Sequence, residues 1–380
     1  MVVGPVVLPG VADTCELEVA DGQIVAIRPV DAERPRLALP AFADLHLHAD
    51  RAYAGGRRPP RSLVDAVELV SEVKRASTEE DIRERALRLL RRALAHGTLR
   101  ARTHVDVDEL VEERALRGVL AARAELAGRL DVEIVAFGTK LCDPTTDDGR
   151  RRLVSAVEAG ADLVGAVPAL HADPEASIAA VLALARELGV PADLHVDETT
   201  DPSALRLERV ADETLALGLE GRVSASHCCS LASVPEGDAR RTIEKVAAAD
   251  ITVIVQPALN LYLQGRGDGT PRARGLTLVR ELRGAGVEVR FGSDNVRDVF
   301  YPYGDADPLE AAWLAAVSAH VDDEDTLLAG VCNGRTRLEV GDPADVVLVD
   351  ALSLEDALAR RPGRRTVVRA GAIVSGPSAG

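Results

Sequence analysis

The feature that most constrains this chain is a repeated alternation of short apolar runs with longer amphipathic stretches through its middle. Eight such runs occur, at residues 37–46, 98–104, 132–138, 162–168, 192–195, 222–227, 251–257 and 287–292. Short apolar runs are typical of strands buried in a parallel sheet, and the segments between them have helical spacing. Eight strands, each followed by a helix, predict a (β/α)₈ TIM barrel.

Two of the helical segments have clear end signals. Ser77 and Thr78 precede three acidic residues in a capping sequence, and Gly97 follows the same segment, which predicts a helix between them. The segment 174–189 has proline at its start and glycine at its end, the asymmetry expected of a helix.

The two ends of the chain have a different pattern from the middle. Residues 15–27 alternate weakly around Asp21-Gly22, which predicts a β-hairpin. The segments 345–350 and 365–374 also have the composition of strands. We therefore expect both ends to pair into one small β-domain beside the barrel.

Charge and hydropathy exclude several classes of partner. The chain has 380 residues, of which 47% are hydrophobic, and a formal net charge of −16. An acidic protein is poorly suited to nucleic acid or to an anionic membrane surface, and no apolar stretch reaches the length of about 20 residues that spans a bilayer. We expect a small-molecule ligand, no nucleic acid and no membrane, with a homo-oligomer left open.

The cysteines indicate a reducing compartment. There are five, two of them adjacent, and none forms a Cys-x-x-Cys pair. An odd number without paired spacing is no disulfide framework and no zinc knuckle. Residues 1–9 also lack the basic and long apolar regions of a signal peptide, so a cytoplasmic location is expected.

Histidines gather where the predicted strands end. His46 and His48 are two residues apart, so on an extended strand they point to the same side. His104, His195 and His227 close three other runs. Active sites of (β/α)₈ barrels lie at the carboxyl ends of the strands, so these side chains should converge. Imidazoles together with a carboxylate suit Zn²⁺ or Fe²⁺ with one position open for water.

Six ordered motifs point to a known family. They lie at residues 44–50, 102–106, 194–198, 225–227, 263–266 and 292–295, the last followed by 301–304. In these motifs the chain resembles the amidohydrolase superfamily and, within it, the cytosine deaminase group. The resemblance implies a (β/α)₈ barrel with a small β-sandwich formed by both termini. It assigns 1–36 and 335–380 to the β-sandwich, and 37–334 to the catalytic barrel.

The resemblance also implies roles for particular residues. One divalent metal ion, zinc or iron, would be bound by four side chains: His46, His48, His195 and Asp294. Glu198 would move a proton from the attacking water to a ring nitrogen, His227 would hydrogen-bond the attacking hydroxide, and Asp294 would take a proton from the water. Strand four, at 162–168, contains no lysine, which favours one metal over two.

Substrate contacts are expected at five residues: Thr139, Lys140, Gln264, Asn295 and Phe300. Thr139 and Lys140 replace a Gln-Glu pair of the cytosine deaminases, and Asn295 replaces an aspartate. A site that hydrogen-bonds one ring edge rejects rings that lack the matching groups. Cytosine itself is therefore disfavoured, and Lys140 favours a carbonyl-rich or anionic ring.

The leading hypothesis is a metal-dependent hydrolytic deaminase of a small free nitrogen heterocycle, such as a pyrimidine, triazine or cyclic guanidine. Metal-bound hydroxide would attack, and a tetrahedral intermediate would collapse. The alternatives are a hydrolase of cyclic amides, an enzyme that releases an N-alkylamine, and a non-catalytic amidohydrolase-like scaffold. His104 is expected to support the site rather than react, and His171 is expected to be a loop residue.

Overall fold

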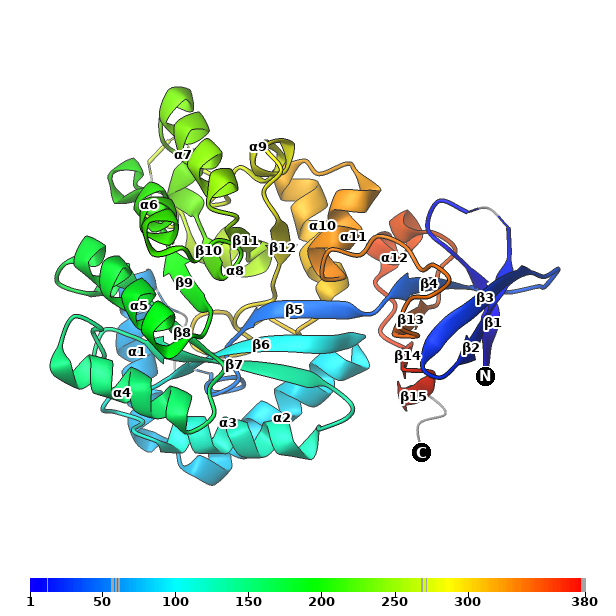
Figure 1. Ribbon diagram of the computed structural model, residues 1–380, viewed down its shortest axis with the longest axis horizontal. Coiled ribbons are helices and arrows are strands. Elements are labelled where there is room, and N and C mark those ends of the chain that lie inside the picture. The colour runs from blue at the N-terminus through cyan, green and yellow to red at the C-terminus, as the bar shows by residue number, and fades with distance from the viewer. Residues whose placement is uncertain are drawn as a thin grey trace.

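A computed structural model describes residues 1–11, 13–55, 58, 60, 62–267, 269–270 and 272–376 of the chain. These residues form a barrel and, beside it, a separate sheet built from both ends of the chain (Figure 1). We call the second part the terminal sheet.

The barrel consists of eight parallel strands in sequence order. Its strands are β5 (Phe42–Leu47), β6 (Thr98–Asp106), β7 (Asp131–Gly138), β8 (Leu163–Ala166), β9 (Ala192–Val196), β10 (Val223–His227), β11 (Thr252–Val255) and β12 (Val289–Phe291). The first and last strands meet through a parallel bridge between Leu47 and Asp294, and the Asp294 amide donates to the His46 carbonyl at 2.8 Å. The predicted (β/α)₈ barrel is confirmed, with a strand at each of the eight apolar runs.

Helices pack around the barrel and over one end of it. They are α1 (Leu63–Ala76), α2 (Glu79–Ala95), α3 (Arg114–Glu125), α4 (Asp147–Glu158), α5 (Pro174–Leu188), α6 (Leu207–Leu217), α7 (Glu236–Ala248), α8 (Pro257–Leu263), α9 (Val279–Gly284), α10 (Pro308–Ala319), α11 (Glu324–Val331) and α12 (Leu354–Arg360). Short 3₁₀ turns lie at Pro168–Leu170 (η1), Pro202–Ala204 (η2) and Cys229–Ala232 (η3).

The predicted end signals of α2 and α5 are confirmed. The Thr78 hydroxyl accepts from the Asp81 amide at the start of α2, and Gly97 beyond its end has a φ of +106°. Gly189 ends α5 in the left-handed region, where a residue without a Cβ meets no steric penalty. The helix α1 is an addition between β5 and α2, and it lies at the end of the barrel away from the terminal sheet (Figure 1).

The terminal sheet has seven strands in the order β15-β14-β13-β4-β1-β2-β3. They are β1 (Val2–Val7), β2 (Cys15–Ala20), β3 (Gln23–Pro29), β4 (Arg36–Pro40), β13 (Val346–Val349), β14 (Arg365–Arg369) and β15 (Ala372–Ser375). The predicted hairpin joins β2 to β3, with positive φ at both Asp21 and Gly22 as a type I′ turn requires.

The two ends of the chain meet at β4, which pairs parallel with β1 and antiparallel with β13. Side chains from both halves of this sheet, including Leu17, Ile24 and Leu348, share one buried core, so the sheet folds over on itself. The predicted apolar run at 37–46 is divided: β4 belongs to the terminal sheet, and barrel pairing begins where the Phe42 amide donates to the Gly97 carbonyl. The terminal sheet thus extends past the predicted boundary at residue 36.

Two further observations concern membrane-spanning helices and the cysteines. No helix in the described part of the chain combines the length and apolar character needed to cross a membrane. The five cysteines are free thiols, and each is buried.

Candidate active site

The carboxyl ends of β5 and β12 bring together the first three candidate ligands. His46 lies in β5, His48 follows it, and Asp294 follows β12 at the bridge that closes the barrel. One oxygen of Asp294, Oδ1, lies 3.7 Å from His46 Nε2 and 3.3 Å from His48 Nε2. The closure of the barrel therefore places the carboxylate against both imidazoles.

The neighbouring strands β9 and β10 supply two more histidines. The ring centroid of His195 lies 4.5 Å from that of His46, and His195 Nδ1 lies 3.3 Å from His227 Nε2. The four predicted metal ligands thus lie close together, and His227 stands beside them. His104 also offers a nitrogen within 4.8 Å of ring nitrogens of His46, His48 and His195. We call His46, His48, His195 and Asp294 the metal cluster.

The metal cluster contains buried polar atoms without hydrogen-bond partners. They are His46 Nε2, His48 Nδ1, His195 Nε2 and both carboxylate oxygens of Asp294. Burial is the largest cause that lowers the pKa of each of the three imidazoles, so they are neutral and each offers a lone pair. Burial also raises the pKa of Asp294, and the nearby Glu198 carboxylate adds to this. Neutral imidazoles and an uncompensated carboxylate fit a divalent cation.

Outer side chains fix the orientation of these rings. Ser226 Oγ lies 2.9 Å from His46 Nδ1, and Asn260 Nδ2 lies 3.1 Å from His227 Nδ1. Such partners hold an imidazole in one tautomer and one direction. The ring of His104 packs 4.3 Å from that of His46, and its Nε2 lies 3.2 Å from Asp193 Oδ1. His104 therefore lies near enough to the candidate ligands to support them.

Glu198 lies beside His227 and borders the metal cluster. Its Oε2 lies 3.8 Å from His227 Nε2, and its Oε1 is buried without a hydrogen-bond partner. Burial raises the pKa of Glu198 to about 8, with Arg51 opposing the shift. A carboxyl group poised near neutrality suits general acid–base catalysis.

A cavity of about 230 Å³ opens onto the metal cluster and Glu198. Four of the five predicted substrate contacts line it: Thr139, Lys140, Asn295 and Phe300. Gln264 does not line this cavity, because its side-chain amide donates to the Glu198 carbonyl at 3.0 Å and faces a neighbouring cavity. Phe300 lies under the Arg51 guanidinium, whose central carbon is 4.9 Å from the ring centroid.

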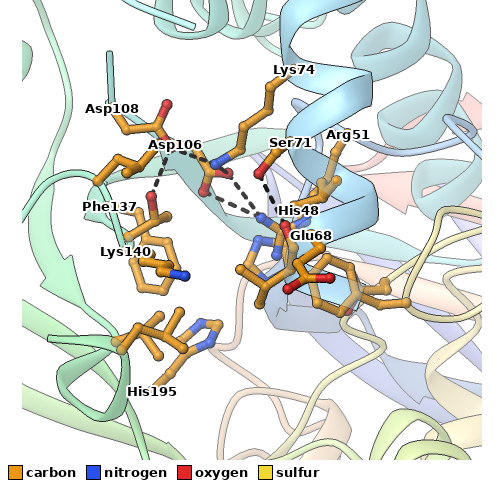
Figure 2. A pocket seen from close by; sticks show the side chains of 18 of the residues that line it. His48, Arg51, Glu68, Ser71, Lys74, Asp106, Asp108, Phe137, Lys140 and His195 are labelled. Carbon is orange, nitrogen blue, oxygen red and sulfur yellow. Dashed lines mark hydrogen bonds and ion pairs between the residues drawn. The ribbon is translucent and has the colours of Figure 1, made fainter. Parts of the chain in front are cut away.

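One wall of the cavity carries charged residues to which the sequence analysis assigned no role (Figure 2). Lys74, on α1, reaches 2.6 Å from Asp106 Oδ2 and 2.5 Å from Asp108 Oδ2. Asp108 also accepts from the Thr139 hydroxyl at 2.7 Å, and Arg51 donates to Asp106 at 3.2 Å. The sequence contained a signal that could have placed three of these residues near the site. Asp106 and Asp108 lie two residues apart at the end of β6, and Arg51 follows the His-x-His motif.

Two further candidate residues, His171 and Lys140, differ in their contacts. His171 lines neither cavity; its Nδ1 lies 2.7 Å from Ser177 Oγ and its Nε2 lies 3.0 Å from the Thr139 carbonyl, which ties the Thr139 loop to α5. Lys140 is exposed and makes no ion pair with any residue in the described ranges. It is thus a free cation at the rim of the cavity.

Comparison with known proteins adds independent observations. A model of the amidohydrolase family matches residues 63–375. The pterin deaminase of Rhizobium rhizogenes is 36% identical over 383 residues, which cover 94% of this chain and 87% of that protein.

Two solved structures share the fold at 30% identity. The 5-methylcytosine deaminase from Klebsiella pneumoniae, liganded with 5-fluorocytosine, has a TM-score of 0.90, covering 100% of this chain and 98% of that one. The N-isopropylammelide isopropylaminohydrolase from Burkholderia multivorans has a TM-score of 0.82 and covers 97% of each chain. With the family model spanning most of the chain, this protein belongs to the amidohydrolase family.

Proposed function

We propose that this protein is a metal-dependent hydrolytic deaminase of a small free heterocycle that carries an amino group and a ring carbonyl, as pterin does. The observation that carries the proposal is the Glu198 carboxyl group, which has one buried and unpartnered oxygen and borders the cavity beside His227 and the metal cluster. The similarity to a pterin deaminase and to a 5-methylcytosine deaminase supports hydrolysis of a C–N bond outside peptides.

The metal cluster would hold one divalent ion, Zn²⁺ or Fe²⁺, which when bound lowers the pKa of a water molecule. Water adds to the carbon that carries the amino group, the C–N bond breaks, ammonia leaves and a carbonyl remains. Glu198 moves a proton from the water to a ring nitrogen. His227 hydrogen-bonds the attacking oxygen, with its ring held by Asn260.

The charged wall favours a ring with a carbonyl oxygen. Arg51 and Lys140 place positive charge on the cavity, where an exocyclic oxygen could accept from them. The proton of the Thr139 hydroxyl is committed to Asp108, so its free lone pairs are available to a ring N–H. Asn295 donates to Asp298 at 2.5 Å and keeps its amide oxygen for the ring. These contacts match a ring edge that presents an N–H beside a carbonyl.

A second candidate is release of an alkylamine from a ring, which the similarity to the N-isopropylammelide enzyme favours. The same metal cluster and Glu198 would serve both reactions. The products separate them: a coupled assay for ammonia responds to deamination, and amine analysis responds to dealkylation.

We also propose a cytoplasmic location, consistent with five free and buried cysteines.

The Glu198→Gln substitution tests the proposal on a panel of pterin, cytosine, 5-methylcytosine and N-isopropylammelide. The amide is nearly isosteric but cannot transfer the proton, so kcat should fall by about 10²–10⁴-fold with the metal content unchanged. Metal analysis of the same preparation is the control. Full turnover by Glu198→Gln, or no ammonia from any ring, would refute the proposal.

A further inference from the structure

A second cavity, of about 520 Å³, adjoins the first. We call it the side chamber. Val167, Leu170, His195 and Glu198 line both cavities, so the side chamber opens where the reacting ring would lie. The first cavity, at about 230 Å³, is smaller than the ~300–1,000 Å³ typical of ligand sites, which leaves room there for a ring system but not for a long substituent.

The floor of the side chamber is apolar. It is formed by η1 and by side chains from α5 and α8, among them Pro168, Ile178 and Leu263. Among the polar residues that line it, Asp197 is committed to the protein. The Asp197 carboxylate accepts from the Arg206 and Leu207 amides at 2.8 and 3.0 Å. This surface therefore suits an apolar stem.

Two guanidinium groups, those of Arg206 and Arg266, stand at the side chamber. Arg206 donates from Nη1 to two backbone carbonyls, and its Nε lies 3.8 Å from Glu175 Oε1. Arg266 stacks on Tyr262, with 4.1 Å from its central carbon to the ring centroid, and its Nε donates to the Tyr262 carbonyl. Among the described residues Arg266 has no carboxylate within ion-pair distance, which leaves both of its terminal nitrogens for a ligand.

We propose that the side chamber binds a substituent of the substrate, namely an apolar stem that ends in an anionic group paired with Arg266. The proposal rests on the proposed function, since the amino-bearing ring must lie at Glu198 for its substituent to enter the chamber. It identifies the substrate class as a heterocycle substituted at a position remote from the reacting carbon. It also gives Gln264 a different role from the predicted one: it braces the Glu198 backbone and forms part of the chamber wall.

The test compares kcat/KM on three substrates: 2-amino-4-oxopteridine, the same ring with a neutral alkyl substituent, and the ring with an alkyl carboxylate of equal length. The wild-type enzyme should prefer the carboxylate over the neutral substituent by roughly tenfold, the effect of about 1.4 kcal/mol of charge-assisted contact. Arg266→Ala should abolish that preference. Ala169→Trp, which places an indole in the chamber from an exposed position, should reduce kcat/KM for both substituted rings relative to the bare ring.

Matched controls lie outside both cavities. Ala172→Trp adds the same ring to the same loop, and Arg240→Ala removes an exposed guanidinium from α7; both should keep the wild-type ratios. The proposal that the side chamber binds a substituent would be refuted if Ala169→Trp and Arg266→Ala left the kcat/KM ratios unchanged. It would also be refuted if the wild-type enzyme preferred the bare ring. In either case the proposed function would stand. No ammonia from any of the three rings or the earlier panel would overturn both.

Discussion

Two buried polar clusters at opposite ends of the barrel differ in one respect, the pairing of their charges. At the junction of the barrel with the terminal sheet, Arg365 of β14 makes two bonds of 2.7 Å to Asp307 and a third, also 2.7 Å, to the His96 carbonyl. We call Arg365, Asp307 and His96 the junction cluster. In the metal cluster, by contrast, imidazole nitrogens and both oxygens of Asp294 have no hydrogen-bond partner.

The contrast lies in how the charge of each cluster is compensated. A buried charge is tolerated when an opposite charge and hydrogen bonds compensate it, as they do for Arg365. Uncompensated buried acceptors are costly, so a set of them at one point indicates a ligand that the protein is built to bind. The junction cluster holds two parts of the fold together, whereas the unpartnered acceptors of the metal cluster fit a cation.

The strongest expected effect is at the metal cluster. His195→Ala removes one imidazole, so the bound metal and the turnover should be lost together. Elemental analysis and an ammonia assay on the same sample measure both. His171→Ala, a buried histidine outside the cluster, is the control and should retain its metal. Retention of stoichiometric metal by His195→Ala would contradict the assignment.

The junction cluster should affect stability and not chemistry. Arg365→Ala leaves Asp307 buried without its partner, which should lower the free energy of unfolding by about 3–5 kcal/mol. Arg369→Ala on the same strand breaks an exposed pair with Asp131 and should cost at most about 1 kcal/mol. Urea denaturation measures both, and metal content should remain at the wild-type level. Equal losses in the two variants would remove the distinction between the pairs.

A smaller effect is expected from the residues that orient the metal cluster. Ser226→Ala deletes the hydroxyl group 2.9 Å from His46 Nδ1, which should weaken metal binding by about 10–100-fold. Competition with a chelator measures the affinity. Ser224→Ala on the same strand is the matched control, because its hydroxyl accepts from Arg102 and touches no candidate ligand. An unchanged affinity in Ser226→Ala would show that this bond does not tune the site.

The smallest effect concerns pH and the junction cluster. His96 is 3% exposed, and burial is the largest cause that lowers its pKa, with Arg365 and Arg92 adding to this against Asp307 and Asp305. The unfolded chain therefore binds the proton more readily, so this contribution to stability is full above about pH 6.5 and declines as the pH falls below it. Urea denaturation across this range should show a smaller decline for His96→Gln than for the wild type. A decline of equal size would exclude His96 as its source.

The sequence by itself determined the architecture. Eight apolar runs separated by helical spacing allow few arrangements other than a (β/α)₈ barrel, and Asp21-Gly22, Thr78 and Gly189 define local ends through their own backbone preferences. The order of the histidines along the runs also predicted which strand ends would meet, because parallel strands of a barrel all end on one side. These signals are local in the sequence, so they can be recognised without knowing the distances between residues in space.

Only the tertiary structure decided where the terminal sheet ends and the barrel begins, and which residues line the cavity. The split of the run at 37–46 depends on which strand each half pairs with, and its apolar composition is the same on both sides of Pro40. The charged wall required α1 to fold over the barrel and bring Lys74 to Asp106 and Asp108, across more than thirty residues of chain. Gln264 faces the side chamber and not the first cavity for the same reason, since a side chain's direction is set by its neighbours in space and not by its motif.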